Sequence, residues 1–451
     1  MSDLEQFGYR EQLARRLSTL DLVVYGMIFM VPIAPFAIFG FVLQEARGMV
    51  ALAYLIGLAG MLFTALSYAS MSRAFPVAGS VYAYAHRGLH PLVGFFAGWL
   101  ILLDYILLPA LCYVVSAIAM RGLAPAVPAW VWLLGFVGCN ALVNIRGIHL
   151  AARVNLYLLA FELLTLGLFL VAALHALAGG AGAGALTLRP LYDPARFSLA
   201  AVAGATSVAV LSFLGFDGIS TLAEENRGVA GSIGRATIGA LLLVGALFVL
   251  QSWVAADLAR GMRFASLDVA FYEICRRAGG NGLRLLVIGA NIIAVGVADA
   301  MAAQAAVSRI LFAMARDGRL PRALARIHPR FRTPYNGTLL VAVVSFAVSW
   351  LFAAHLDDLT RIVNFGALSG FLLLHVSVVN HYFRRQHSRD WLRHLICPIA
   401  GIVVIGYVLY EMDAKAKLLG ACWLGIGVLY YVTLSRVTRK RPSALQADAS
   451  S

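Results

Sequence analysis

Residues 212–227 read Ser-Phe-Leu-Gly-Phe-Asp-Gly-Ile-Ser-Thr-Leu-Ala-Glu-Glu-Asn-Arg, and this stretch is the most informative part of the sequence. It closes an apolar run that begins near Ser198 and is long enough to cross a bilayer. Gly215, Asp217 and Gly218 lie inside that run, where a charge is unfavourable unless it faces a polar cavity or a partner. Backbone loosened by glycine is tolerated in a membrane only where it lines a cavity or is buried in protein. The stretch therefore predicts a broken, acid-bearing membrane span of the kind that forms a binding site.

The composition predicts an all-α integral membrane protein with about twelve spans. Of the 451 residues, 61% are hydrophobic and only 13% are charged, whereas a soluble domain has about 25% charged residues. Apolar runs of about 20 residues mark the spans. We expect them near residues 20–43, 49–72, 91–120, 127–145, 154–178, 198–223, 236–258, 282–315, 337–354, 359–382, 393–411 and 418–435.

We attribute the formal net charge of +14 to the way in which the spans are oriented in the membrane, and not to a nucleic-acid partner. If the N-terminus is cytoplasmic, Lys and Arg gather mainly in the cytoplasmic segments, above all from Arg316 to Arg332. The basic residues are spread over many segments without a nucleic-acid-binding motif. We therefore expect a multi-pass protein of the cytoplasmic membrane, in contact with lipid, with both termini cytoplasmic and no nucleic-acid partner.

The ends of the chain and the cysteines add little chemistry. Residues 1–19 carry acids and bases without an apolar core, which predicts a cytoplasmic segment and no cleavable signal peptide. Residues 436–451 are expected to form a disordered cytoplasmic tail. The five cysteines show no paired spacing, so neither a disulfide framework nor a metal site is expected, and no motif calls for a cofactor.

A second interrupted span suggests internal symmetry within one transmembrane domain, residues 20–435. In the first span, Pro32 and Pro35 remove two backbone donors and should open the helix near mid-membrane. Spans one and six are five apart, as in transporters built from inverted repeats with substrate between the broken helices. We expect repeats at about 20–178 and 198–382, with appended helices at about 393–435. Ordinary proline kinks and glycine packing sites are the alternative explanation.

Four acids lie within the spans, away from their ends: Asp104, Glu162, Asp217 and Asp299. Away from the ends of the spans, the one strong base is Arg309. Buried carboxylates without bases must be protonated, bind a cation or face water, which suits a cationic substrate, a proton or both. Structural alternatives remain: Asp104 could make a polar contact, Glu162 could be a neutral core acid, and Asp299 lies on a small-residue packing face.

The first span also gives a negative argument about the substrate. Transporters of this architecture hold an amino acid's carboxylate on free N–H groups at a half-helix N-terminus. Pro32 and Pro35 stand where those donors would be needed. The span is therefore a poorer anion site, which favours a substrate that carries only amines.

The end of the sixth span and two aromatic residues complete the candidate set. Glu224 and Glu225 are expected to form a cytoplasmic salt-bridge cluster with the nearby Arg227 and Arg235, which could act as a gate. Tyr105 and Phe216 each adjoin a membrane acid, and aromatic faces attract ammonium groups.

At these residues the chain resembles the amino acid–polyamine–organocation transporters, and among them the bacterial putrescine importers. The resemblance covers nearly the whole chain. The matching stretches are Phe75-Pro76-Val77-Ala78-Gly79-Ser80, Leu103-Asp104-Tyr105, Ser212-Phe213-Leu214-Gly215-Phe216-Asp217, Val307-Ser308-Arg309, Arg316-Asp317, His328-Pro329, Arg332-Thr333-Pro334 and Asn364-Phe365-Gly366-Ala367-Leu368.

The resemblance implies a leucine-transporter-like bundle of five plus five inverted helices, and secondary active uptake, usually with protons. Pro32 falls where the putrescine branch also has a proline, and Tyr105 matches a tyrosine assigned there to substrate binding. The chain departs from that pattern at Ala37, Glu162 and Asp299, which puts the position of a second amine, and putrescine itself, in question.

Together these features predict an importer of a small organic cation, putrescine or a related polyamine, by proton symport. An amino-acid permease of the same superfamily is the alternative; a membrane enzyme or a channel fits the sequence less well. The expected substrate site comprises Asp217, Tyr105, Phe216, Gly215, Gly218, Pro32 and Asp104. Glu162 and Asp299 are expected to couple protons, and Glu224 and Glu225 to form the gate.

Overall fold

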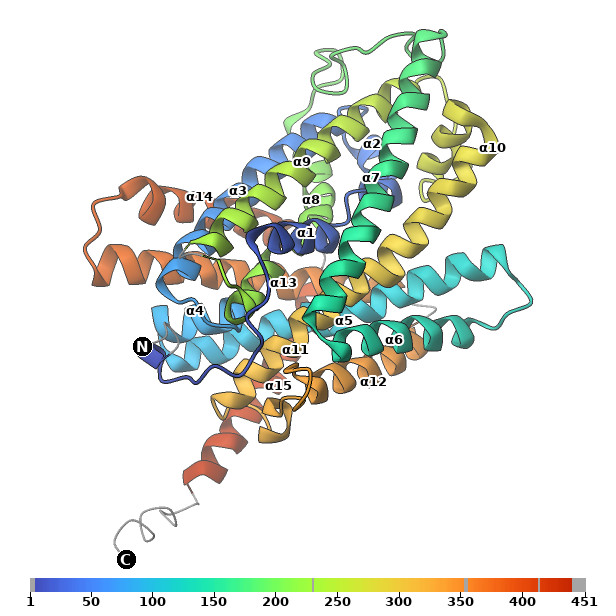
Figure 1. Cartoon of the computed structure of the whole chain (residues 1–451). Coiled ribbons are helices and arrows are strands. Elements are labelled where there is room, and N and C mark those ends of the chain that lie inside the picture. The colour runs from blue at the N-terminus through green and yellow to red at the C-terminus, as the bar shows by residue number, and fades with distance from the viewer. Residues whose placement is uncertain (1–4, 229–230, 353–355, 413, 440–451) are drawn as a thin grey trace, which may run out of the picture.

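The computed structural model describes residues 5–228, 231–352, 356–412 and 414–439. Over these ranges the chain is helical, and the only β pairing is a single bridge between Leu17 and Asn226 (Figure 1). Eleven helices in the described ranges are long and apolar enough to cross a membrane, and a bent pair makes a twelfth. The prediction of about twelve spans is confirmed.

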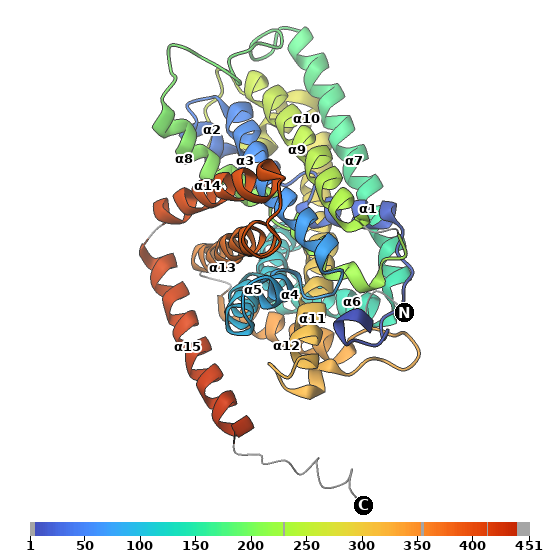
Figure 2. The same cartoon turned by 90° about the vertical axis from the view of Figure 1, so that its left-hand side faces the viewer.

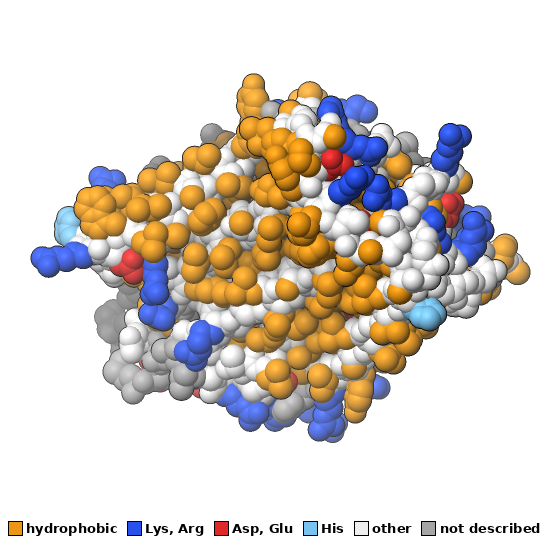
Figure 3. Space-filling view, turned by 90° about the horizontal axis from the view of Figure 1, so that it is seen from above, with side chains coloured by type: hydrophobic (Ala, Val, Ile, Leu, Met, Phe, Trp, Pro, Cys, Tyr) orange, Lys and Arg blue, Asp and Glu red, His pale blue; other side chains and the backbone are white. Residues whose placement is uncertain are grey.

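The spans pack as one bundle with an apolar exterior. One face presents a broad field of hydrophobic side chains, with Lys and Arg gathered toward its margins (Figure 3). Such a surface suits a lipid environment. The unbroken helices are α3 (Val50–Ala74), α5 (Pro91–Leu123), α6 (Ala129–Arg146), α7 (Ile148–Ala178), α9 (Ser232–Leu258), α12 (Tyr335–Phe352), α13 (Leu356–Val378), α14 (Cys397–Glu411) and α15 (Ala414–Arg439).

The first span is broken where the prolines predict. It consists of α1 (Thr19–Met30) and α2 (Pro35–Glu45), which meet at an angle of 55°. Ser18 begins α1 through a reciprocal capping box with Asp21, and Pro35 occupies the first turn of α2, where its missing N–H is harmless. Val31, at the break, has a φ of 51°.

The sixth span is broken at Gly215. It consists of α8 (Leu199–Ala209), the short helix η2 (Val210–Phe213) and the 3-10 helix η3 (Phe216–Glu225). Gly215 has a φ of 109°, and a Cβ atom there would lie 2.4 Å from the carbonyl oxygen of Phe29. A Cβ on Gly218 would lie 2.3 Å from the Phe29 ring. The two glycines therefore let the break of span six pack directly against the break of span one.

The eighth span is longer and less regular than expected. It runs through α10 (Ala270–Ile293), the π-helix η4 (Ala294–Asp299) and α11 (Ala300–Arg316). The backbone is not helical at Gly279 and Gly280, so residues 270–278 form a separate helical segment before a kink, and the helix after the kink begins close to the predicted residue 282. The π-turn ends at Asp299, and such turns are frequent at functional sites.

The last two helices, α14 and α15, lie at the side of the bundle (Figure 2). Helix α15 continues to Arg439, so residues 436–439 of the expected disordered tail are helical, which corrects that boundary. The rest of the expected tail, residues 440–451, lies outside the described residues. The short helix α4 (Ser80–Gly88) connects spans two and three, and a loop over residues 179–198 connects spans five and six.

Candidate functional site

A cavity of about 170 Å³ lies beside the two helix breaks. It is formed by both halves of span one, the break of span six, and helices α5, α10 with η4, and α13. Its lining residues are Phe29, Met30, Val31, Ala34, Ala37, Leu108, Leu111, Leu211, Ser212, Leu214, Asn291, Val295, Asp299, Val363 and Asn364. The prolines and glycines that break the spans therefore position a cavity where inverted-repeat transporters hold substrate.

The polar groups of this cavity present hydrogen-bond acceptors that lack donors. Asp299 Oδ1 and Asn291 Oδ1 are buried without a hydrogen-bond partner among the described residues. The other Asp299 oxygen accepts from the Cys112 thiol at 3.3 Å, and the Asn291 amide nitrogen donates to the Tyr272 hydroxyl at 2.8 Å. No lysine, arginine or histidine is among the described residues that line the cavity. Buried acceptors require donors, so this lining complements a ligand that carries N–H groups.

Asp217 lies next to this cavity but is not among its lining residues. It is buried in η3, where Tyr105 of α5 donates to its Oδ2 at 2.5 Å and Tyr68 of α3 donates to the same oxygen at 3.3 Å. Phe29 contacts both regions: it is a lining residue of the cavity, and its ring packs edge-on against Tyr105 with centroids 5.8 Å apart. The expected pairing of Asp217 with Tyr105 is present, and Phe29 lies next to both Tyr105 and the cavity.

Phe216 belongs to the aromatic wall around Asp217. Its ring packs edge-on against Tyr68 at 6.0 Å and tilted against Phe371 of α13 at 5.8 Å. Tyr68 was not singled out in the sequence, because a tyrosine in the apolar run of span two carries no local signal. Its hydroxyl becomes informative only when the fold brings α3 against η3.

The backbone of the span-one break is already largely hydrogen bonded. The N–H groups of Ala34, Phe36 and Ala37 donate to carbonyl groups one turn earlier, at 2.7, 3.0 and 3.2 Å. The Pro32 carbonyl accepts from the side-chain amide of Gln251 of α9 at 2.8 Å. These bonds leave few free N–H donors for an anion, in keeping with the expectation from Pro32 and Pro35 that the first span is a poor anion site. The bond from Gln251 also gives Pro32 a structural role in fixing the break.

Asp104 and Glu162 are buried acids that do not line the cavity. Asp104 Oδ1 in α5, and both carboxylate oxygens of Glu162 in α7, have no hydrogen-bond partner among the described residues. Asp104 lies within electrostatic range of Asp217 and Asp299, and Glu162 lies within range of Asp299. Of the four membrane acids predicted from the sequence, only Asp299 lines the cavity.

Glu224 and Glu225 pair with arginines of α11. Glu224 accepts two hydrogen bonds from the Arg316 guanidinium at 3.0 and 2.8 Å, and one from the Ala78 N–H at 3.0 Å. Glu225 forms a buried ion pair with Arg309. The expectation that Arg227 and Arg235 supply the partners is wrong, because α11 packs against η3 and reaches the acids across more than eighty residues of sequence.

Residues 5–18, which we call the N-terminal strap, lie across this acid–arginine cluster. The backbone N–H groups of residues 16 and 17 donate to the Glu225 carbonyl at 2.9 and 3.0 Å. The Tyr9 hydroxyl donates to Asp317 at 2.8 Å, and the Arg316 guanidinium lies 3.6 Å from the Tyr9 ring centroid. Burial and the neighbouring Asp317 raise the pKa of Tyr9, which keeps it a hydrogen-bond donor at neutral pH. The strap thus joins span one, η3 and α11 at one end of the bundle.

Comparison with known proteins agrees with this architecture. The family model named Amino acid permease matches residues 21–410. The low-affinity putrescine importer PlaP of Escherichia coli K12 is 30% identical over 95% of this chain and 96% of its own length. The branched-chain amino acid permease BcaP and a methylthioribose transporter of Bacillus subtilis are each 27% identical, over 94% of this chain and of their own lengths. Multi-pass helices, two broken spans and a family match over most of its length show that this chain is a membrane transporter that belongs to the amino acid permease family.

Proposed function

We propose that the protein imports a small organic cation, in the first place putrescine or a related polyamine, by proton symport. The observation that carries the proposal is the lining of the central cavity. Asp299 and Asn291 present buried oxygen acceptors without donors, and no basic side chain is among the described lining residues. An ammonium group supplies hydrogen-bond donors and a positive charge together, so it meets both needs of such a lining.

Two further observations favour an amine over an amino acid. The N–H groups that follow the span-one break are engaged with backbone carbonyls, so a substrate carboxylate would find few donors there. A relative that matches nearly the whole chain is a putrescine importer. The competing candidate is an amino-acid permease of the same family, favoured by the similarity to a branched-chain amino acid permease and by the apolar part of the lining.

In this proposal the buried acids have distinct roles. Asp217 receives an amine of the substrate after Phe29 moves, with Tyr105 and Phe216 walling the site and Asp104 nearby. Gly215, Gly218 and Pro32 shape the backbone of the site. Glu162 and Asp299 exchange the coupled proton, since a desolvated carboxylate can bind and release protons near neutral pH.

The proposed orientation places both termini in the cytoplasm and the protein in the cytoplasmic membrane. The pairs formed by Glu224 and Glu225 then close the cytoplasmic end, together with the N-terminal strap. Opening toward the cytoplasm requires these pairs to separate while the opposite end closes.

Uptake by proteoliposomes tests the proposal. Vesicles that contain the purified full-length protein should accumulate labelled putrescine when an inward proton gradient is imposed. Unlabelled diamines should compete, whereas alanine, leucine and glutamate should not. Protein-free vesicles supply the background, and replacing sodium with potassium should leave uptake unchanged.

Three results would contradict parts of the proposal. Uptake of a zwitterionic amino acid without diamine uptake would favour the permease alternative. Sodium-dependent uptake that persists with a proton ionophore would exclude proton coupling. Ion currents that correspond to transport rates far above the turnover rate of a carrier would indicate a channel.

A further inference from the structure

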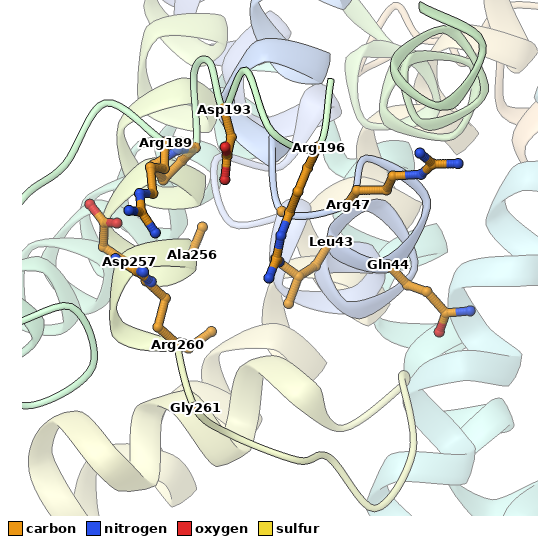
Figure 4. Close-up of a pocket in the computed structure, with 13 residues that line it drawn as sticks. Leu43, Gln44, Arg47, Arg189, Asp193, Arg196, Ala256, Asp257, Arg260 and Gly261 are labelled. Carbon is orange, nitrogen blue, oxygen red and sulfur yellow. The ribbon is translucent and has the colours of Figure 1, made fainter. Parts of the chain in front are cut away.

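A second cavity, of about 500 Å³, lies at the other end of the bundle from the N-terminal strap (Figure 1). Figure 4 shows the residues that line it. It is formed by the end of α2, the end of α9 and the loop over residues 179–198. Four arginines line it: Arg47, Arg189, Arg196 and Arg260. Nothing in the proposed transport cycle uses them, and they are brought together from three separate segments of the chain.

The two acids of this cavity do not neutralise the arginines. Asp257 is engaged by Thr187, whose N–H and hydroxyl donate to its two oxygens at 2.6 and 2.7 Å. Asp193 accepts the N–H of Ala195 at 3.2 Å. Within the part of the chain that the structure describes, no ion pair joins either acid to an arginine of the cavity. Four positive and two negative side chains leave the cavity with an excess of positive charge.

The backbone that presents these arginines is fixed by hydrogen bonds. The Trp253 indole of α9 donates to the Thr187 carbonyl at 2.7 Å, and the Leu52 N–H of α3 donates to the Pro190 carbonyl at 3.2 Å. The Ala183 N–H donates to the Asp257 carbonyl at 3.0 Å. The loop is therefore held against two spans, which fixes the backbone next to Arg189, while the four arginine side chains are exposed to a ligand.

The pocket lies at the level where the membrane meets water. Arg47 is in the short connection between α2, which ends at Glu45, and α3, which begins at Val50; Arg260 follows the end of α9 at Leu258. The adjoining loop and the start of α8 expose large apolar side chains: Leu188 is 69% exposed and Leu199 is 74% exposed. Tyr192 and Phe197 are also exposed and contact each other, with ring centroids 5.5 Å apart. Exposed aliphatic and aromatic residues beside basic ones are typical of a membrane interface.

We propose that this arginine pocket binds the phosphate group of an anionic membrane lipid from the facing leaflet. Guanidinium groups form bidentate hydrogen bonds with phosphate, and basic pockets between membrane helices bind anionic headgroups. The exposed apolar residues beside the pocket provide a surface for the acyl chains. A lipid bound there connects α2, the second half of the broken first span, with α9 and the loop.

Lipid binding to the purified full-length protein tests this proposal. After removal of native lipid, phosphatidylglycerol or phosphatidylcholine is titrated and the bound lipid is counted by native mass spectrometry. The variant combines Arg47→Gln with Arg196→Gln, and the control combines Arg263→Gln with Arg276→Gln, two exposed arginines outside the pocket. Each basic residue near a membrane surface contributes about five-fold to anionic-lipid binding, so the variant should bind phosphatidylglycerol about 10- to 30-fold more weakly.

The control variant and phosphatidylcholine should show no such difference. Equal binding of phosphatidylglycerol by the wild-type protein and the pocket variant would overturn the proposal. A third arm titrates inorganic phosphate: binding of phosphate without binding of phosphatidylglycerol would overturn the assignment to a lipid. Thermal unfolding of each variant without lipid verifies that the proteins compared are folded.

Discussion

At the scale of single residues, Asp217 is the most informative side chain to change. Asp217→Asn should weaken putrescine binding by about 10- to 100-fold, since an ammonium–carboxylate contact in a partly dehydrated site contributes about 1.5–3 kcal/mol. Tyr105→Ala should weaken binding less, through lost packing and cation–π attraction. Scintillation proximity binding with labelled putrescine gives both constants.

The exposed acid Asp268 provides the matched control, because Asp268→Asn removes the same charge outside the site. The Asp217→Asn variant must first be shown to insert into the membrane and to remain monodisperse after purification. If Asp217→Asn then binds putrescine with wild-type affinity, the carboxylate only holds Tyr68 and Tyr105 in place, and Asp104 is the next acid to test.

The sequence predicts the acids better than it predicts their partners. An acid in an apolar run is conspicuous, so Asp217 and Asp299 could be identified from the sequence pattern alone. Tyr68 and Asn291 could not, because their importance depends on which helices the fold packs together. Nor could the sequence show that Phe29 contacts both Tyr105 and the cavity.

At the scale of the helices, the contact between the two broken spans can be tested at Gly215. Gly215→Ala adds a Cβ atom 2.4 Å from the Phe29 carbonyl oxygen at a φ of 109°. Such a backbone conformation costs about 1–3 kcal/mol for a residue other than glycine, and the close contact adds to that cost. We expect a lower melting temperature in detergent and strongly reduced transport.

Helix α9 offers a control for that substitution. A Cβ on Gly239 meets no atom within 4 Å, so Gly239→Ala should leave transport unchanged and slightly stabilise the helix. Equal melting temperatures for Gly215→Ala and the wild-type protein would mean that the break of span six is not packed against Phe29 as described.

The proposed gate, formed by Glu224 and Glu225 at the end of the bundle where the strap lies, predicts an effect on accessibility. Arg316→Lys replaces two hydrogen bonds to Glu224 with a single point charge, which should favour the state open at this end. In an otherwise cysteine-free background, alkylation of Ala223→Cys should become about ten-fold faster or more, because one hydrogen bond between charged groups is worth about 1.5–3 kcal/mol. Arg322→Lys, on the exposed surface, should not change the rate. An unchanged rate in Arg316→Lys would argue against a gate.

Helix positions and breaks follow from local chemistry, whereas pairings between helices do not. Pro32, Pro35 and Gly215 each disrupt a helix by their own covalent structure, so both breaks could be predicted. The partners of Glu224 and Glu225 could not, because nearby Arg227 and Arg235 are the natural local choice. The correct arginines come from α11, and only the packed bundle identifies them.

At the scale of the whole molecule, coupling should depend on Glu162. Glu162→Gln keeps the size of the side chain but removes the proton-binding group, so binding should be largely intact while accumulation against a gradient is abolished. Counterflow of labelled putrescine with no proton gradient should persist. Glu273→Gln, near the start of α10, serves as the control. Normal gradient-driven accumulation by Glu162→Gln would exclude this residue as the proton carrier.

The central cavity also sets a limit on molecular length. A volume of 170 Å³ equals the space of about six water molecules in the liquid, and putrescine has a similar number of non-hydrogen atoms. A triamine such as spermidine is larger than putrescine and exceeds this volume, so we expect that the two ends of the bundle cannot both close around it. The protein should therefore select its substrates by length. Short diamines should complete the transport cycle, whereas longer polyamines should bind and inhibit transport by holding one end of the bundle open.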